Sequence, residues 1–480
     1  MLLSGPSPTH SASLHTSHAA SRPAVRPDLA PGYEAWYGAY FGGSKIGFAH
    51  LTTGDTTVRG RRAVRVEMQF STQIILLGHE VSQDIDQVDS VFTNGDPALT
   101  EFTERSAGHV SHVSATYTPH SIACVIDSSG EISNKTVPIP NGVKLGSGSD
   151  FTLSPTVLRL GGHWSEDYFN PATLALEKMT SRVIGPVPHA GTSGSRLWQV
   201  EGRTSSGIVQ LSVTEAGEVV RVTMPLGIVV VKEPRETACA AGIYHPGPDL
   251  AEVGAVVSDA RIDHPREVTE LHVILSGVPT ETSLPSGDGQ QAQRTPSGAW
   301  DVTITRTKPS LDQVSLPEAS PAEFLASTPE INASSPEIVS TARHILAGES
   351  SATKGIILLR NWVNTHMRVR YDIGVLRSGL DILHQPEGVC RDYAVLYASM
   401  ARAAGIPTRI CSGIVLWQGK FYYHAWAESF AEHWVRVDPT MSQETADATH
   451  IALARGDARS MYQIAGVVGS IKLHVLKVKD

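Results

Sequence analysis

The sequence predicts an α+β protein in which antiparallel, β-rich accessory domains precede a C-terminal domain of helices packed on an antiparallel sheet. The chain has 480 residues, more than a single hydrophobic core usually accommodates. Short runs in which apolar and polar residues alternate extend to about residue 305, the pattern of strands. Beyond residue 335 apolar residues recur roughly every three to four positions, as on one face of a helix. We therefore expect two or three domains.

Residues 1–31 are rich in Ser, Pro, His and Ala and contain few bulky apolar side chains. Such a segment cannot bury enough apolar surface to offset the entropy lost on ordering. We interpret it as a disordered tail, and its histidines, His10, His15 and His18, as solvated side chains rather than a metal site.

A β-rich accessory domain is expected over residues 32–235. Its tyrosine-rich opening is followed by a glycine-containing turn at residues 42–44 and a second apolar run, which indicates strand, turn and strand. Further turns are expected at residues 53–55 and 216–217. The expected strands cover residues 33–41, 46–51, 63–70, 207–213 and 219–224.

A small β-sandwich-like module is expected over residues 250–310. Residues 268–275 and 300–305 have the composition of strands, and a polar stretch rich in Gly and Pro separates them. Three prolines, Pro309, Pro317 and Pro321, then interrupt a polar segment, which we interpret as a linker.

The C-terminal domain is expected over residues 323–480. Ser335 and Pro336 provide an N-cap and a first-turn proline for a helix that ends before Gly348. Two more helices and three strands follow in the order helix, helix, sheet. The expected helices cover residues 336–347, 352–369 and 390–405, and the expected strands 408–416, 421–430 and 434–438.

The overall charge and hydropathy exclude several classes of partner. The formal net charge is −9 and no run of Lys or Arg forms a basic stripe, so nucleic acid is not an expected partner. No segment approaches the roughly 18 consecutive apolar residues of a membrane span, and the first residues lack the apolar core of a secretory signal. We expect a soluble protein, cytoplasmic by default, with export possible if the start is misassigned.

Cys390 is the candidate nucleophile. The thiolate is the reactive form of cysteine, and the free N–H groups at a helix N-terminus stabilise negative charge. Gly388 precedes Cys390 closely, and a helix is expected to start at the cysteine. The other three cysteines, Cys124, Cys239 and Cys411, lack these features and metal or disulfide spacing, so we interpret them as structural.

His424 and Asp438 are the candidate base and its orienting carboxylate. His424 lies in an expected strand, and Asp438 ends the next one, where Pro439 stops the ladder. If the hairpin turns about Ala431, His424 and Asp438 are direct cross-strand neighbours, with Cβ atoms about 5 Å apart. A carboxylate at that distance orients an imidazole and favours its charged form. Nucleophile, base and orienter are the parts that acyl transfer through a thiol requires.

Four segments around these residues resemble the core of the transglutaminase-like superfamily, of bacterial type. They are Glu387-Gly388-Val389-Cys390-Arg391-Asp392-Tyr393-Ala394, Ala404-Gly405-Ile406-Pro407-Thr408-Arg409, His424-Ala425-Trp426 and Trp434-Val435-Arg436-Val437-Asp438-Pro439-Thr440. The likeness covers roughly residues 323–456. It implies a papain-like fold, Cys390 as nucleophile, His424 as general base and then acid, Asp438 as orienter, and no cofactor or metal.

The same resemblance implies attack on amide or peptide bonds of a protein or peptide substrate through a thioester. Hydrolysis by a protease or amidase is the expected outcome. Transfer to an amine, as in a cross-linking transglutaminase, is the first alternative, and a non-catalytic peptide-binding module is the second. The β-rich accessory domains are expected to act as scaffold in that last case.

Other residues near the motif are weaker candidates. The backbone N–H of Cys390 is the expected first oxyanion donor, and Gln385, Trp362 and Tyr371 are open alternatives for a second. Trp417 and Trp426 could line a channel that excludes water, but packing is the preferred interpretation. His109 and His112 have ligand-like spacing without a further ligand, and we interpret them as surface histidines.

Overall fold

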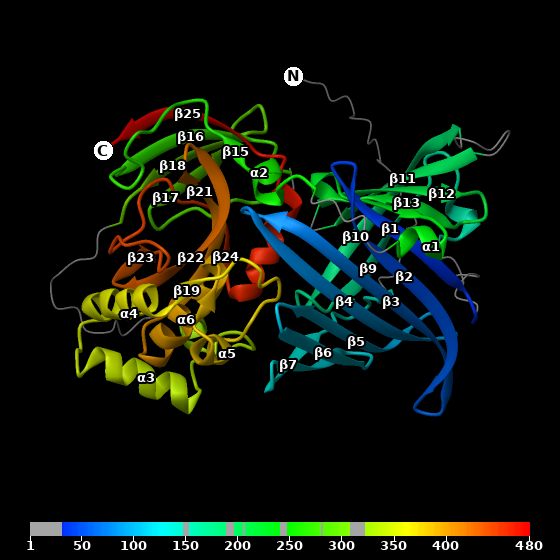
Figure 1. The fold of residues 1–480 in the computed structure, drawn as a ribbon, viewed down its shortest axis with the longest axis horizontal. Coiled ribbons are helices and arrows are strands. Elements are labelled where there is room, and N and C mark those ends of the chain that lie inside the picture. Colours follow the sequence, from blue (N-terminus) through cyan, green and yellow to red (C-terminus); the bar gives the residue numbers. More distant parts are fainter. Residues whose placement is uncertain are drawn as a thin grey trace, which may run out of the picture.

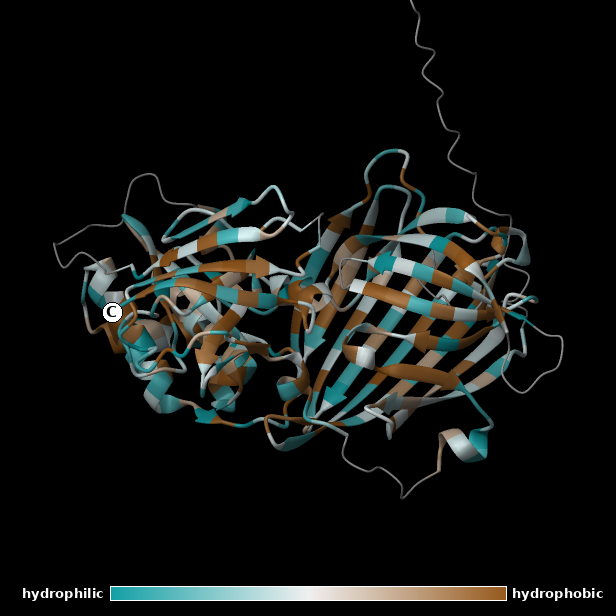
Figure 2. Ribbon diagram, turned by 90° about the horizontal axis from the view of Figure 1, so that it is seen from above, coloured by the Kyte–Doolittle hydropathy of each residue, from teal (hydrophilic) through white to brown (hydrophobic). Residues whose placement is uncertain are grey.

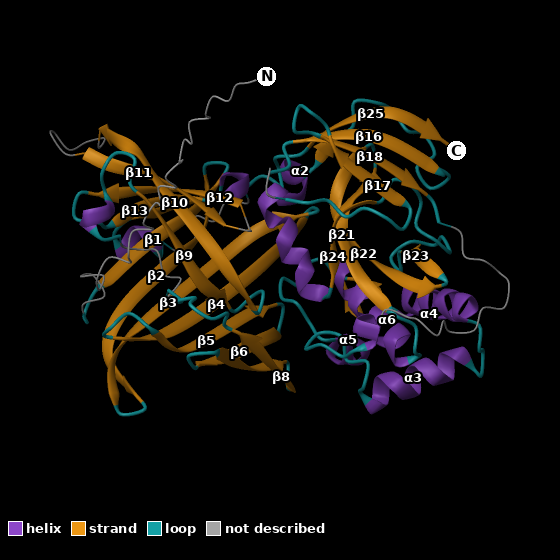
Figure 3. Ribbon diagram, turned by 180° about the vertical axis from the view of Figure 1, so that it is seen from behind, coloured by secondary structure: helices purple, strands orange, loops and turns teal. Residues whose placement is uncertain are grey.

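The computed structural model of the chain describes residues 31–146, 153–188, 196–204, 207–240, 247–279, 282–307 and 322–480. The expected tail, apart from residue 31, and the three linker prolines lie outside these ranges. Two lobes lie side by side, one built from the N-terminal strands and one from the C-terminal helices and sheets (Figures 1 and 3).

Over the residues that the structure describes, the N-terminal lobe is one antiparallel sheet of fourteen strands. The chain runs back and forth through β1 to β8, crosses to β9 at the opposite edge, and returns through β14 beside β1. The strands are β1 (Glu34–Phe41), β2 (Ser44–Val58), β3 (Arg61–Leu76), β4 (His79–Phe92), β5 (Pro97–Ser106), β6 (His109–Tyr117), β7 (Ser121–Ser128), β8 (Glu131–Pro138), β9 (His163–Asn170), β10 (Ala175–Pro188), β11 (Arg196–Thr204), β12 (Gly207–Thr214), β13 (Val219–Thr223) and β14 (Val229–Lys232).

Alternating burial explains why this sheet curls around a core. Along β5 every second side chain is buried, and apolar and polar residues alternate along the strands in Figure 2. Strands from both ends of the sheet share apolar contacts, because the rings of Tyr117 in β6 and Phe169 in β9 meet edge to face at 6.2 Å. The curled sheet thus encloses its own hydrophobic core.

The expected turn at residues 53–55 is wrong. These residues lie inside β2, where Gly54 pairs with Arg65 of β3. The chain reverses instead at Arg59 and Gly60, which have φ values of 51° and 73°. Two consecutive residues with positive φ form the turn that matches the twist of a hairpin.

The C-terminal lobe has a five-stranded sheet with helices packed at one end. The sheet order is β15 (Val256–Val257), β22 (Lys420–Ala431), β21 (Thr408–Trp417) and β24 (Ile451–Gly456), with β23 (His433–Val437) paired to β22. A parallel pair, β19 (Arg368–Val369) and β20 (Glu387–Gly388), lies beside it. The helices of this lobe are α2 (Leu250–Gly254), α3 (Pro336–Leu346), α4 (Ala352–His366), α5 (Gly379–His384) and α6 (Cys390–Ala403), and a run of 3-10 turns covers Ala458–Val467. The short helix α1 (Arg235–Ala238) packs on β1 and β2 of the N-terminal lobe (Figure 1).

The helices form where the sequence supplies caps and an apolar face. α3 starts after Ser335 with Pro336 in its first turn and ends at Ala347, which has a left-handed φ of 49°. α4 was expected to reach residue 369, but it ends at His366 because the next residues form β19. Ile356, Leu359 and Val363 of α4 share a core with α6 and with Val435 of β23.

The segment expected as a sandwich-like module forms one layer of a larger core. β16 (Glu270–Ser276), β17 (Gln290–Arg294) and β18 (Trp300–Thr305) join β25 (Lys472–Lys479), near the end of the chain, in a four-stranded sheet. This sheet packs on Ile414, Phe421 and Ile451 of the five-stranded sheet. The buried Arg436 links the two sheets, because its guanidinium donates to the carbonyl oxygens of Gly289, Thr305 and His450.

The two lobes meet through buried polar groups. Ser106 Oγ accepts a hydrogen bond from the amide of Gly374 at 2.8 Å, and His109 Nδ1 lies 3.4 Å from a carboxylate oxygen of Asp381. His109 is 3% exposed, so its interpretation as a surface histidine is wrong; His112, three residues along the strand, is 39% exposed at its side chain. Within the described residues, no helix has the length and apolar composition needed to cross a bilayer.

Substituting Arg436 tests the shared core of the two sheets. We expect Arg436→Met to lower the free energy of unfolding by about 3 kcal/mol or more, because three carbonyl oxygens lose their hydrogen bonds from a buried guanidinium. Urea denaturation followed by tryptophan fluorescence measures this. Arg62→Met, at a side chain that is 84% exposed, is the control and should change stability by less than about 0.5 kcal/mol. Equal, small effects of both substitutions would contradict the shared core.

Candidate active site

Cys390 occupies the first position of α6, at the end of a tight turn. The turn is held by Asp392, whose Oδ2 accepts from the amide of Val389 at 2.9 Å. Asp392 is in turn paired with the buried Arg377, with Nε and Oδ1 3.2 Å apart. Gly388 has a φ of 152°, and a Cβ there would lie 2.4 Å from Asp392 Oδ2. The turn therefore requires glycine, and it fixes the cysteine at the helix N-terminus.

His424 and Asp438 lie together, but not through the expected register. β22 and β23 pair Ala431 with His433 and Ala427 with Val437, so the hairpin is centred on Glu432, whose φ is 65°. The expected centre at Ala431 is wrong by one residue, which shifts the pairing by two. A shift of two keeps the same faces together, and Asp438, just beyond β23, reaches His424 diagonally.

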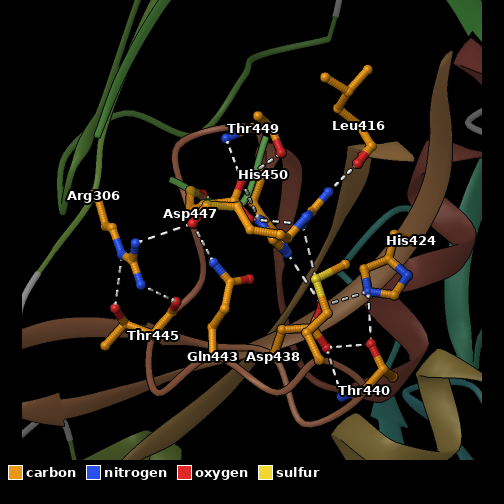
Figure 4. Close-up of polar contacts among 12 residues, drawn as sticks. Arg306, Leu416, His424, Asp438, Thr440, Gln443, Thr445, Asp447, Thr449 and His450 are labelled. Carbon is orange, nitrogen blue, oxygen red and sulfur yellow. Dashed lines mark hydrogen bonds and ion pairs between the residues drawn. The ribbon is translucent and has the colours of Figure 1, made fainter. Parts of the chain in front are cut away.

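The Asp438 carboxylate has a hydrogen-bond donor on every side. Oδ2 lies 2.8 Å from Nε2 of His424 and 3.2 Å from Nε2 of His450. Oδ1 accepts from the amide of Thr440 at 2.8 Å and from its hydroxyl at 2.6 Å. Figure 4 shows this arrangement. Because Asp438 is 1% exposed, these donors replace water around its charge.

Cys390, His424 and Asp438 shift one another's ionisation in a consistent direction. Burial disfavours the Cys390 thiolate, but the charge of His424 and hydrogen bonds from its ring and from the Ala425 amide lower the pKa of the thiol overall. Burial also disfavours charged His424, yet Asp438 and Cys390 raise its pKa to about 10. The pKa of Asp438 falls well below its ordinary value despite burial, mainly because of His424. Each shift favours the charged form of its group.

Two other cysteines have the opposite environment. Cys411 is fully buried, and desolvation followed by the nearby Glu428 raises its pKa well above the ordinary value. Burial raises the pKa of Cys124 to about 11. Cys239 is partly buried and lies outside this cluster. Of the four cysteines, Cys390 thus has the surroundings of a nucleophile.

Sequence reasoning missed the polar residues beneath Asp438. His450, Asp447 and Thr440 lie in or beside the loop between β23 and β24, and Arg266 comes from the segment before β16. Arg266 Nη1 donates to Asp447 Oδ2 at 2.7 Å across 181 residues of chain. Of these four residues, only Thr440 lies in a sequence motif, the segment from Trp434 to Thr440. No local pattern in the sequence marks His450, Asp447 or Arg266.

His424, Asp438 and His450 also form a set of potential metal ligands among the described residues, with one ligand atom of each within 4.8 Å of the others. Both imidazoles point to the same carboxylate oxygen at hydrogen-bond distance. The two nitrogen-to-oxygen separations are those of ordinary hydrogen bonds, and we interpret them as such.

The weaker candidates have mostly structural surroundings. Trp426 is fully buried between Cys411 and Ala452, and Trp417 is 52% exposed at the end of β21. Trp362 stacks on His366 within α4, and Tyr371 stacks on His79 of the N-terminal lobe at 4.6 Å. Gln385 ends α5, and its carbonyl accepts from Arg377. A second oxyanion donor is therefore not identified among them.

A separate cavity of about 950 Å³ lies between the lobes. It is lined by residues of β11, β12, β21 and β24 together with loops of the four-stranded sheet, and none of Cys390, His424 and Asp438 contributes to it. Its three arginines are engaged: Arg203 contacts Glu201, Arg409 contacts Asp288 and Glu428, and Arg455 contacts Glu428. The cavity is thus distinct from the Cys390 cluster.

Comparison with known proteins places this cluster in a family. Residues 339–439 match the transglutaminase-like superfamily. A stretch of 111 residues, 21% of this chain, is 31% identical to an uncharacterized protein of Mycobacterium leprae, and it spans 40% of that relative.

Two solved structures resemble parts of the chain at low identity. A β-barrel-like protein from Brucella abortus, with a domain of unknown function, is 11% identical over 44% of this chain and 96% of its own, with a TM-score of 0.32. The periplasmic domain of TgpA from Pseudomonas aeruginosa, solved with ethylmercury, is 17% identical over 40% and 92%, with a TM-score of 0.27. From the family match, residues 339–439, which include Cys390, His424 and Asp438, are a transglutaminase-like superfamily domain.

Proposed function

We propose that this protein is a cysteine-dependent hydrolase that attacks amide or peptide bonds through a thioester, with Cys390, His424 and Asp438 as a papain-like catalytic triad. The observation that carries the proposal is the short polar chain from a helix-terminal thiol through an imidazole to a fully hydrogen-bonded carboxylate. Membership of residues 339–439 in the transglutaminase-like superfamily supports the same chemistry.

Acylation begins with the Cys390 thiolate. Its sulfur attacks the carbonyl carbon, a C–S bond forms, and the carbonyl electrons move to oxygen. The amide of Cys390, at the first position of α6, is one of the helix N–H groups without a partner inside the helix, and it serves as an oxyanion donor. The C–N bond then breaks as His424 transfers its proton to the leaving nitrogen. A thioester and neutral His424 remain.

Deacylation reverses the proton transfers. Neutral His424 removes a proton from water, and the resulting hydroxide oxygen attacks the thioester carbon. The C–S bond breaks, the thiolate of Cys390 returns, and the carboxylic acid leaves. Asp438 keeps the His424 ring oriented and stabilises its charged form in both halves of the cycle.

Two alternatives differ from the proposed hydrolase. In the first the thioester reacts with an amine in place of water, and in the second no thioester forms. With an amine such as lysine as the second nucleophile, the enzyme is a cross-linking transglutaminase. Without thiol chemistry, the domain is a peptide-binding module. The lowered pKa of Cys390 argues against the binding module, because binding alone needs no ionised thiol.

Alkylation of the thiol tests its activation. We expect iodoacetamide to modify Cys390 at pH values well below about 8.5, where an ordinary thiol is protonated, and much faster than Cys411. The modified peptides are quantified by mass spectrometry across a pH series. Equal rates at Cys390 and Cys411, both rising only near that pH, would rule out an activated nucleophile.

Neutralising Asp438 tests its role as orienter. Asp438→Asn removes the charge that raises the pKa of His424. Because a raised imidazole pKa keeps the proton at higher pH, its loss should shift the alkaline limb of the alkylation profile to lower pH. Turnover should fall about a hundredfold or more. Asp263→Asn, at a side chain 58% exposed, is the control; identical profiles for both variants would exclude the role.

The reaction class is tested with casein, in the presence and absence of a labelled primary amine. Cleavage that exceeds amine incorporation, and that disappears in Cys390→Ala, is the expected result. Incorporation in excess of cleavage would instead identify a cross-linking enzyme. If the wild type shows fast alkylation of Cys390 but neither cleaves casein nor incorporates the amine, casein is excluded as a substrate and the thiol chemistry stands.

A further inference from the structure

A second imidazole lies on the far side of Asp438. The His450 side chain is completely buried, and its Nε2 is 3.2 Å from Asp438 Oδ2. Its Nδ1 is 3.1 Å from the backbone oxygen of Asp447 and 3.4 Å from Oδ1 of the same residue. Figure 4 shows His450 between Asp447 and Asp438.

The partners of His450 determine its protonation. A neutral imidazole has one N–H and one lone pair, whereas the charged ring has two N–H groups. Both nitrogens of His450 face oxygen acceptors, so a neutral ring would place a lone pair against an oxygen. With both nitrogens protonated, each acceptor has a donor. The geometry therefore requires an imidazolium if the two carboxyl groups are ionised.

Both carboxyl groups have the donors that keep them ionised. Asp447 is fully buried, and its oxygens accept from the Thr449 amide at 2.8 Å, the Thr449 hydroxyl and Arg266 Nη1 at 2.7 Å. Asp438 accepts from Thr440 and His424 in the same way. Neither carboxyl group is left to donate a proton to the ring.

The result is a chain of alternating charges that ends at the nucleophile. The sign of the charge alternates from residue to residue, starting with a positive charge, along Arg266, Asp447, His450, Asp438, His424 and Cys390. Two further cations lie close: Arg436 donates to the His450 carbonyl at 3.2 Å and Arg360 to the Asp438 carbonyl at 3.5 Å. The edge of Trp426 meets the His450 ring at 5.3 Å. Asp447 and Asp438 are the anions that contact the ring.

We propose that His450 is a positioning residue for the thiol chemistry. Asp447 keeps His450 as an imidazolium, which fixes the Asp438 carboxylate and competes with His424 for the negative charge of that carboxylate. This inference rests on the proposed function. Asp438 alone would bind the His424 proton very tightly, and a general acid that never releases its proton cannot act as a base afterwards. A second cation, His450, on the same Asp438 oxygen weakens the attraction between Asp438 and the His424 proton.

The sign of the effect follows from the charges. Removing the positive charge of His450 while keeping a donor to Asp438 leaves the carboxylate to act fully on His424. The His424 proton is then lost at higher pH. A simple loss of structure around Asp438 would have the opposite effect, because an imidazole without its carboxylate loses its proton at lower pH.

His450→Gln and Asp447→Asn test the proposal in the full chain. The Gln amide can donate to Asp438 without charge, and the Asp447→Asn substitution removes one of the two anions that keep His450 protonated. The probe is iodoacetamide, and the readout is the pH profile of alkylation on the peptide that carries Cys390. We expect the upper inflection of both variants to move to higher pH, by about one unit. His474→Gln, at a side chain 63% exposed, should match the wild type.

The outcomes separate the two proposals. The role of His450 alone is overturned by the following result. The wild type has a low first inflection, but the upper inflection of His450→Gln and Asp447→Asn stays at the wild-type pH or moves to lower pH. A wild-type Cys390 that reacts as an ordinary thiol overturns the proposed function. Should a variant fail to fold, nitrogen-15 NMR of histidine-labelled wild type decides at about pH 8.5, where ordinary histidines are neutral. Imidazolium signals from both His424 and His450 are expected, and a neutral His450 would contradict the proposal.

Discussion

The arrangement depends on one constraint, which is that a charge buried away from water must have partners. Asp438 is the centre of the polar chain, and it is almost completely buried. A carboxylate there is tolerated because four donors from His424, His450 and Thr440 surround its two oxygens. The same rule extends in both directions, to Asp447 and Arg266 on one side and to the thiol on the other.

The fold supplies those partners from segments far apart in the sequence. Cys390 is placed by the turn that Gly388, Asp392 and Arg377 build before α6, and His424 by its strand in the five-stranded sheet. Arg266 and the four-stranded sheet come from residues well upstream, and β25 from the last residues of the chain completes that sheet. The polar chain beneath Asp438 thus needs segments outside the matched residues 339–439.

Local signals in the sequence predicted much of this. Short-range patterns mark the start of α3, the helix that starts at Cys390, and the strands that carry His424 and precede Asp438, and the structure has them close to the expected bounds. The expected cap residue Ser335 precedes α3, but its side chain makes no capping hydrogen bond. The hairpin register was wrong by two positions, but period-two alternation kept His424 and Asp438 together. The sequence predicts a turn at Gly54 because glycine is conformationally permissive, whereas pairing with β3 keeps this residue in a strand. Long-range pairing decided the rest: no local pattern reveals that β25 joins β16, or that His450 lies under Asp438.

The central claim is that Cys390 and His424 form a thiolate–imidazolium pair at neutral pH. Thiolate absorbance in the ultraviolet, taken as the difference between the wild type and Cys390→Ser over a pH series, measures it directly. The account predicts that the wild type already has one thiolate at about pH 7. In His424→Ala this thiolate should form only in the range of an ordinary thiol, near about pH 8.5. A wild-type thiolate that forms only in that range, with or without His424, would contradict it.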